Sequence, residues 1–253
     1  MKKVKYLFFI LVIASLTLVL FPKIIHKSYA AGRVSVPILM YHYIRAYTNA
    51  KDTTGEGLSV SPSVFDQEMG YLAQNGYTPI SLDTLYGIFN NQAPLPPKPI
   101  VITFDDGYID FYANAYPILK KYGFHAVVFV ITGFVGQPPF LSWNNIHEMQ
   151  SSGLITFEAH TVNHAYLPKL SFTNMLKELQ DSKNTLQSQT GYTVNFIAYP
   201  FGASNSTVWN AARQAGFVGG LGTWYGKPSS PGMNMPRVRI SGNISLQNFA
   251  SRL

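Results

Sequence analysis

Short β-branched apolar runs alternate with segments of helical spacing along most of this 253-residue chain. Repeated strand–helix units imply a mainly parallel sheet covered by helices. Seven or eight such units in about 220 residues favour a closed barrel over an open sheet, because barrel units have this size. We therefore predict an α/β fold, a distorted barrel of seven or eight strand–helix units. The predicted strands are 36–41, 77–80, 99–102, 126–131, 154–157, 195–199, 217–221 and 236–240.

The segments between these runs carry helix signals. Ser61-Pro62-Ser63 is typical of a helix start, because proline is tolerated in the first turn. Gly123, Gly153 and Gly216 are expected to end helices. Residues 48–57 are polar and contain glycine, so we expect a loop there. The predicted helices begin at Ser61, cover 81–89, 111–122, 143–150, 173–189 and 204–215, and include the tail from Ser245.

The first 30 residues have the pattern of a secretory signal. Lysines at 2, 3 and 5 precede an apolar run over 6–21, and Ser28-Tyr29-Ala30 offers small residues for cleavage after Ala30. The run is slightly short for a spanning helix, and an uncleaved N-terminal anchor is the alternative. We expect a signal peptide or membrane anchor at 1–30 and one domain at 34–253. The protein is then expected to be secreted or extracytoplasmic, with membrane anchoring or association with the cell wall as further options.

The formal net charge of +7 gives a misleading picture of the folded domain. Residues 1–30 contain five lysines and no acidic residue, so the rest carries fourteen basic against twelve acidic residues. This near balance removes the argument for a nucleic-acid partner, which needs a basic patch on the domain. The chain has no cysteine, which excludes disulfides and a lipid-modified cysteine. We expect a monomer that contacts a membrane only through an uncleaved N-terminal segment.

Two polar strings follow predicted strands about 50 residues apart. Thr103-Phe104-Asp105-Asp106-Gly107-Tyr108 follows 99–102, and His160-Thr161-Val162-Asn163-His164 follows 154–157. One carboxylate and two imidazoles suit a divalent ion such as Zn²⁺, and three protein ligands leave a position for water. The neighbouring carboxylate is then free to act as a base on that water. Either string alone would indicate only a solvated turn or surface histidines, but together at strand ends they predict an active site.

The strings resemble those of the polysaccharide deacetylases of carbohydrate esterase family 4, the NodB-homology domain. The resemblance covers roughly residues 34–253. It implies that Asp105 is the general base, and that Asp106, His160 and His164 bind the metal. The implied cofactor is one divalent ion, Zn²⁺ before Co²⁺, Ni²⁺ or Mn²⁺, and the implied substrate is an acetylated polysaccharide.

Other implied site residues belong to the substrate groove. Ala198-Tyr199-Pro200-Phe201-Gly202 is similar to the family's third motif, which lines the groove and supplies a backbone N–H to the oxyanion. Tyr199, Pro200 and Phe201 are therefore substrate-binding candidates, with Phe201 as the N–H donor. Tyr108 is expected to flank the groove. Trp224, which follows the predicted strand 217–221, resembles an aromatic wall for the acetyl methyl group.

The sequence departs from the family pattern at two points. The third motif normally begins with an arginine that orients the catalytic aspartate, and here the position is Ala198, so another residue must hold Asp105. The family's catalytic-acid histidine normally lies near the C-terminus, but no histidine follows His164. Leu39-Met40-Tyr41-His42 supplies the candidate, with His42 as the acid. This arrangement resembles the circularly permuted branch that includes the poly-β-1,6-N-acetylglucosamine deacetylases.

The leading functional hypothesis is a metal-dependent deacetylase that removes N-acetyl groups from an N-acetylglucosamine polymer of the cell wall or an exopolysaccharide. An O-acetyl esterase acting on acetylated xylan is an alternative within catalysis. A non-catalytic cell-wall glycan-binding protein is an alternative of another class, motivated by Ala198. The intact pairs of aspartates and histidines favour catalysis.

Overall fold

A computed structural model describes residues 34–47, 51–242 and 244–253. The predicted signal or anchor at 1–30 lies outside this range. Within it, no helix has both the length and the apolar character needed to cross a membrane.

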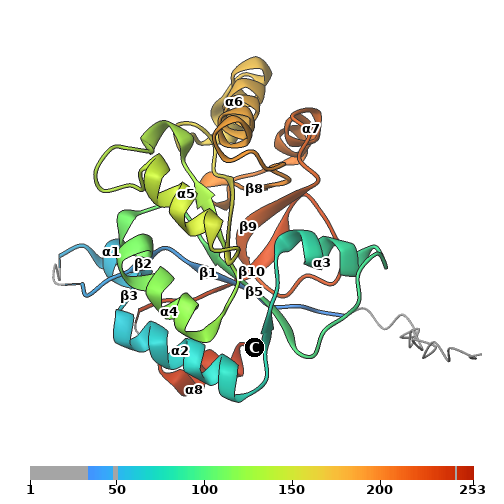
Figure 1. Cartoon of the computed structure of the whole chain (residues 1–253). Helices are drawn as coiled ribbons and strands as arrows, with labels where there is room; N and C mark the ends of the chain where they lie inside the picture. The colour runs from blue at the N-terminus through green and yellow to red at the C-terminus, as the bar shows by residue number, and fades with distance from the viewer. Residues whose placement is uncertain (1–33, 48–50, 243) are drawn as a thin grey trace, which may run out of the picture. The chain divides into compact units, whose positions relative to one another are not determined.

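Seven parallel strands close into a barrel, as the strand–helix alternation predicts. From β5 to β10 each strand pairs with the next, and β1 closes the ring by pairing with both β10 and β5 (Figure 1). The short strand β4 adds to the edge of β5. The barrel strands are β1 (Ile38–Tyr41), β5 (Pro99–Phe104), β6 (Ala126–Val130), β7 (Ile155–Ala159), β8 (Phe196–Ala198), β9 (Gly219–Tyr225) and β10 (Met235–Arg239), and β4 is Thr78–Pro79.

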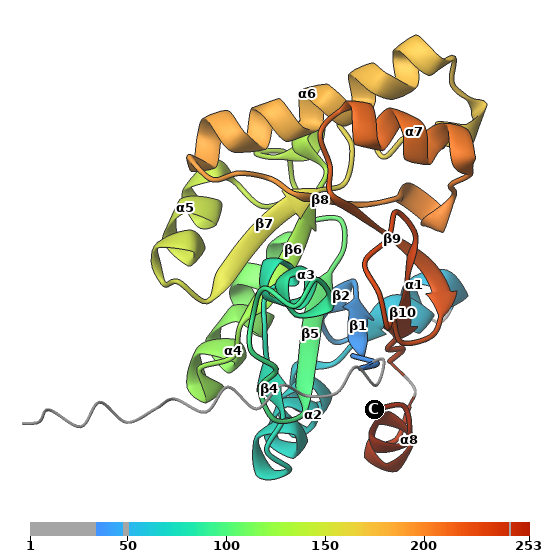
Figure 2. The same cartoon turned by 90° about the vertical axis from the view of Figure 1, so that its right-hand side faces the viewer.

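Helices surround the barrel and begin at the residues that the sequence marks. Side-chain oxygens of Ser61, Ser81, Ser142, Ser171, Asn205 and Ser245 each accept a hydrogen bond from a backbone N–H in the first turn. Figure 2 shows α6 and α7 side by side above β8. The helices are α2 (Pro62–Gln74), α3 (Leu82–Phe89), α4 (Tyr116–Tyr122), α5 (Trp143–Ser151), α6 (Phe172–Thr190), α7 (Ser206–Gln214) and α8 (Leu246–Ser251).

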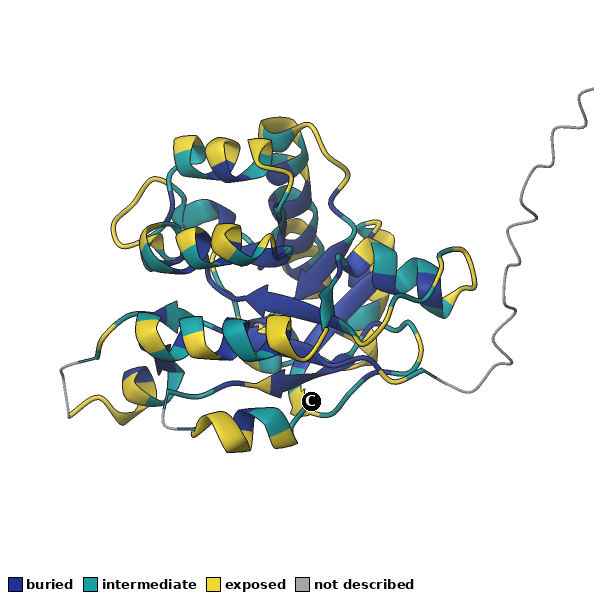
Figure 3. Cartoon of the chain, turned by 60° about the horizontal axis from the view of Figure 1, so that its bottom comes forward, coloured by how far each residue is buried: buried dark blue, intermediate teal, exposed yellow. Residues whose placement is uncertain are grey.

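Two apolar cores hold the barrel and its helices together. The larger core lies between the outer face of the barrel and the surrounding helices, for example Leu39 and Ile102 against Phe65 and Leu119. The smaller core fills the barrel interior, where Val101, Phe129 and Leu221 meet Leu85 of α3. Figure 3 shows the strands buried within helices whose outer faces are exposed. Helix α3 packs on this interior core, and the opposite end of the barrel, at the carboxyl ends of the strands, holds the cavity described below.

The structure corrects several predicted boundaries. The expected loop at 48–57 contains helix α1 (Thr53–Leu58), which begins because the Asp52 side chain accepts from the Gly55 N–H. The predicted strand at 217–221 extends to Tyr225, so Trp224 lies within β9 and not after it. The predicted helix at 111–122 opens with a π-helical turn, η1 (Phe111–Ala115). A two-stranded pair, β2 (Tyr43–Ile44) with β3 (Ser59–Val60), was not predicted, because two-residue strands leave no periodicity in sequence.

Candidate active site

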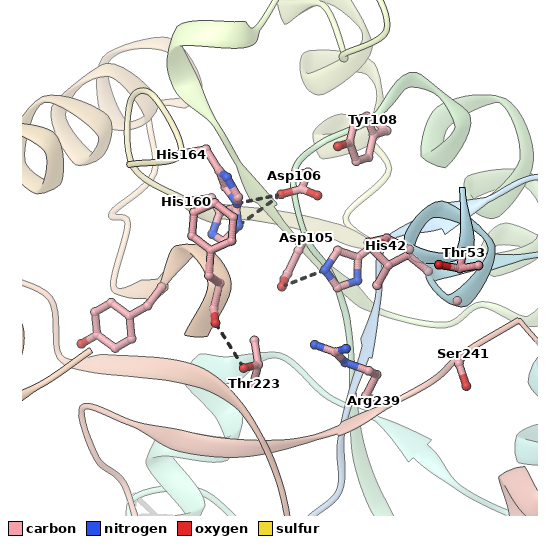
Figure 4. Close-up of a pocket in the computed structure, with 15 residues that line it drawn as sticks. His42, Thr53, Asp105, Asp106, Tyr108, His160, His164, Thr223, Arg239 and Ser241 are labelled. Carbon is pink, nitrogen blue, oxygen red and sulfur yellow. Dashed lines mark hydrogen bonds and ion pairs between the residues drawn. The ribbon is translucent and has the colours of Figure 1, made fainter. Parts of the chain in front are cut away.

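A cavity of about 600 Å³ opens at the carboxyl ends of the barrel strands (Figure 4). Its lining includes most of the residues that the sequence singled out, contributed by the ends of β1, β5, β7 and β8. Parallel strands bring these residues together because their carboxyl ends meet at one rim of the barrel. The predicted residues that line the cavity are His42, Asp105, Asp106, Tyr108, His160, His164, Tyr199 and Phe201.

Asp106, His160 and His164 form a group that can hold a metal ion. One ligand atom from each lies within 4.8 Å of the others. Oδ1 of Asp106 is 3.2 Å from Nε2 of His160 and 3.5 Å from Nε2 of His164. Asp106 and His160 are buried, and His164 is partly exposed towards the cavity. Three converging donors with one open side are the arrangement of a catalytic rather than a structural metal site.

The hydrogen bonding of His160 tests whether these residues fit a cation. Nδ1 of His160 lies 2.7 Å from the Ala198 carbonyl oxygen, which can only accept, so Nδ1 carries the proton. When the ring is neutral, as a metal ligand must be, Nε2 presents a lone pair to Oδ1 of Asp106, a buried atom with no hydrogen-bond partner among the described residues. Two facing acceptors at this distance repel unless a cation lies between them. The residues therefore fit a divalent ion.

The backbone around these ligands adopts an uncommon conformation. Asp106, Thr161, His164 and Phe201 all have positive φ, between 53° and 74°. Left-handed conformations cost about 1–3 kcal/mol for residues with a side chain and persist only where surrounding contacts enforce them. Their concentration in the three loops of the cavity indicates that these loops are built to aim side chains.

Glu178 of α6 supplies such contacts for the loop between the two histidines. Its Oε2 accepts from the N–H groups of Val162 and Asn163, both at 3.0 Å, and its Oε1 accepts from the Asn163 side chain at 2.7 Å. One carboxylate thus satisfies three donors of the loop that carries His160 and His164. Glu178 was not predicted as a site residue, because nothing in the sequence links position 178 of a regular helix to that loop.

Arg237 of β10 holds Asp105 in place. Nη1 and Nη2 of Arg237 donate to Oδ1 and Oδ2 of Asp105, both at 2.7 Å, and Nε donates to the Gly222 carbonyl at 2.9 Å. Nη1 also contacts Oγ1 of Thr103 at 3.2 Å. Burial would raise the pKa of Asp105, but the charge and hydrogen bonds of Arg237 offset this and hold the pKa well below its usual range. This arginine is the residue that Ala198 left unaccounted for in the sequence.

His42 lies directly after β1, the strand between β10 and β5. Its Nε2 is 3.9 Å from Oδ2 of Asp105, and its Nδ1 is buried without a hydrogen-bond partner among the described residues. Burial lowers the pKa of His42, although the charges of Asp105 and Asp106 act in the opposite direction. The predicted neighbourhood of the first and last strands is confirmed, and it brings His42 into the cavity of the metal-ligand group. Its role as catalytic acid, and the circular permutation, stay predictions.

Aromatic residues form two sides of the cavity. The Tyr108 ring is stacked between Tyr43 and Phe140, with centroids 4.1 and 4.9 Å away. The exposed Phe201 ring meets the His164 ring at 4.5 Å. The predicted substrate roles of these residues are not tested by their placement.

Two further substrate-binding candidates lie elsewhere. Pro200 is buried and does not line the cavity. Trp224 is also absent from the lining, and its ring N–H donates to the Asn234 carbonyl at 3.3 Å. Because neighbouring strand residues point to opposite faces, Thr223 faces the cavity while Trp224 points away from it. The structure therefore does not bring Trp224 together with the other predicted site residues.

This fold and site define a class, the metal-binding hydrolases built on a seven-stranded parallel barrel. Residues 92–220 match the family model described as polysaccharide deacetylase. A Bacillus subtilis protein provisionally named as a polysaccharide deacetylase is 34% identical over 218 residues, which cover 85% of this chain and 75% of that protein. The chain therefore belongs to the polysaccharide deacetylase family, as its motifs predicted.

Two further comparisons relate the chain to named deacetylases. A poly-β-1,6-N-acetyl-D-glucosamine N-deacetylase of Staphylococcus aureus is 30% identical over 226 residues, covering 83% of this chain and 76% of that protein. The structure of a Streptococcus pyogenes deacetylase in complex with acetate matches with a TM-score of 0.81 and 35% identity, over 87% of this chain and 98% of that one. The chain is thus similar over nearly its whole described length to deacetylases, and it is a polysaccharide deacetylase.

Proposed function

We propose that this polysaccharide deacetylase removes N-acetyl groups from an N-acetylglucosamine polymer, using one divalent ion held by Asp106, His160 and His164. The observation that carries the proposal is the placement of this ligand group in the same cavity as the Asp105–Arg237 pair and His42. The similarity to a relative named for a poly-N-acetylglucosamine substrate supports the choice of glycan. Zn²⁺ is the proposed ion, because a mixed nitrogen and oxygen donor set with an open position is typical of catalytic zinc.

In the proposed chemistry, each side chain either transfers a proton or orients a residue that does. When bound, a divalent ion supplies a water of lowered pKa and polarises the acetyl oxygen. Asp105 takes the proton of the attacking water; its two oxygens have about four lone-pair sites, of which Arg237 uses two. His42 donates a proton to the amide nitrogen as the C–N bond breaks. The Phe201 N–H stabilises the negative charge that develops on the acetyl oxygen. The products are acetate and a glucosamine unit.

The non-catalytic alternative rested on the missing arginine at Ala198. Arg237 now provides a bidentate guanidinium to Asp105, so that argument no longer applies. The proposal for catalysis on the cell wall or an exopolysaccharide also requires export. The lysine-rich, apolar start of the chain supports this, and N-terminal sequencing with cell fractionation would distinguish a released from an anchored protein. Unprocessed protein found only in the cytosol would contradict export.

Acetate release from a substrate panel tests the function. The panel comprises poly-β-1,6-N-acetylglucosamine, chitin oligomers, peptidoglycan and acetylated xylan, each with chelator and with Zn²⁺ added back. We expect release from at least one N-acetylglucosamine polymer, loss with chelator and recovery with Zn²⁺. Release from xylan alone would favour the O-acetyl esterase. No release from any member by folded, metal-loaded protein would refute the proposed function.

A further inference from the structure

Arg239 brings an additional positive charge to the cavity. It follows Arg237 by two positions on β10, and because strand residues alternate, both side chains point to the same face. Arg237 is completely buried against Asp105, whereas Arg239 is exposed and lines the cavity. Figure 4 shows the Arg239 guanidinium extending into the cavity on the side of Asp105 and His42 away from Asp106. The guanidinium is therefore accessible to a molecule bound there.

No carboxylate among the described residues forms an ion pair with this guanidinium. Of the two acidic residues of the cavity, Asp105 is paired with Arg237, and Asp106 lies with the two histidines in the metal-ligand group. The Arg252 side chain donates a hydrogen bond to the backbone carbonyl of Arg239, and this bond does not involve the Arg239 guanidinium. Five donors in a planar fork, whose geometry matches a carboxylate or a phosphate, thus face the cavity with no anionic partner in the described chain.

The charge balance of the cavity favours an anionic ligand. Arg237 neutralises Asp105, and a divalent ion would outweigh the single charge of Asp106, so Arg239 adds to an already positive site. A neutral acetamido sugar would provide no anionic partner for the Arg239 guanidinium. Thr53 and Ser241 line the cavity as well, and both are polar residues. The volume of about 600 Å³ exceeds the needs of an acetamide group alone, because pockets of this size hold drug-sized ligands.

We propose that Arg239 binds an anionic group, a carboxylate or a phosphate, that the polysaccharide carries close to the sugar being deacetylated. The inference rests on the proposed function and narrows its substrate class to charged glycans over neutral ones. Two N–H groups of the Arg239 fork donate to two oxygens of the anion and so set which sugar of the polymer enters the site. Because Arg239 is exposed, salt should screen its attraction to the anion, so the preference of the enzyme for charged over neutral glycans should weaken as the salt concentration rises.

The test compares matched oligomers of N-acetylglucosamine that are neutral, carry a carboxylate or carry a phosphate ester. We expect the wild type to have a higher kcat/KM for one charged oligomer than for the neutral one. Arg239→Gln should lower that ratio about 10-fold or more, the size expected for a charge-assisted hydrogen bond, and Arg239→Glu should lower it further. The arm that responds identifies the anion. Arg213→Gln, an exposed arginine on α7 outside the cavity lining, is the matched control.

Binding measured by calorimetry on metal-free protein gives a readout that does not need turnover. Tighter binding of a charged oligomer that Arg239→Gln abolishes would support the subsite even if the catalysed reaction were another one. Equal affinity of wild type for charged and neutral oligomers, or equal losses on all of them in Arg239→Gln, would overturn it. Failure of the proposed function is distinguishable, because it shows as absent acetate release from every oligomer whatever the binding preference.

Discussion

Replacing Arg237 by methionine should separate the positioning of Asp105 from the binding of metal. The substitution leaves a carboxylate that is 3% exposed without its partner, since Arg237 is the residue that contacts both of its oxygens. Breaking a buried ion pair on one side costs about 3–5 kcal/mol. Complete burial of Arg237 and four polar contacts within 3.2 Å put Arg237→Met towards the upper end of this range.

The assay is urea unfolding in the presence of chelator, so that metal binding does not contribute to the free energy of unfolding. Asp105→Asn, Arg237→Met and the double variant complete a cycle. We expect the double variant to be more stable than Arg237→Met, because it contains no unpaired buried charge. Metal content should stay near one ion per chain in Arg237→Met, since Asp106 and the histidines are intact. Turnover should fall about 100-fold, the effect of misplacing a reacting group by roughly 1 Å.

Arg237→Lys keeps the positive charge but lacks the planar guanidinium that donates to both oxygens of Asp105. This variant provides the test if Arg237→Met does not fold. It should cost less stability than methionine and still lower kcat with little change in metal content. The reasoning would be refuted by an Arg237→Met variant whose free energy of unfolding is within about 0.5 kcal/mol of the wild-type value and whose kcat is unchanged. A variant that loses its metal together with its activity would show that Arg237 acts on the ligand group instead.

Three further predictions concern the metal and the core. Asp106→Ala should lose both metal and activity, measured by elemental analysis and acetate release, and metal content unchanged in this variant would contradict its assignment as a ligand. Glu178→Ala should weaken metal affinity about 10–100-fold in a chelator competition, whereas Asp181→Ala on the same helix should not, and equal effects would exclude a specific role in the loop. Burial raises the pKa of Glu68 from 4.5 to about 7 despite its hydrogen bond from Tyr41. The folded state therefore holds the proton longer than the unfolded state, so stability should fall by about 3 kcal/mol as pH rises from 4.5 to 7, and Glu68→Gln should remove this fall in urea unfolding at pH 5 and 8.

The sequence predicts the barrel well because its signals are local. Most strands are short apolar runs, and most helices begin at a serine or asparagine whose side chain caps the first turn, as at Ser61 and Asn205. Helix α1 was missed because a six-residue helix capped by Asp52 has too few turns to show a period. The length of β9 was underestimated because its glycines interrupt the apolar pattern that marks a strand.

The site residues that could be predicted are likewise those whose signals are local in the sequence. Asp106, His160 and His164 lie at the starts of the loops that follow β5 and β7, so the barrel brings them together. Glu178 and Arg237 could not be found in this way, because each acts on a residue far away in sequence and lies in the middle of a regular element. Trp224 was placed by resemblance alone: the strand continues through this position, and its ring lies outside the cavity lining, so its substrate role stays a prediction.

The geometry of a closed barrel explains why Ala198 can stand where the family has an arginine. Ala198 lies in the interior core with Phe129, and the Arg237 guanidinium is 5.8 Å from the centroid of the same Phe129 ring. Strands β8 and β10 therefore both face the space below Asp105, and an arginine from either strand can enter it. One carboxylate can neutralise one buried guanidinium, so a second arginine at 198 would be an uncompensated charge in that space. With Arg237 in place, a small apolar residue at 198 is what the interior requires, and its carbonyl still orients His160.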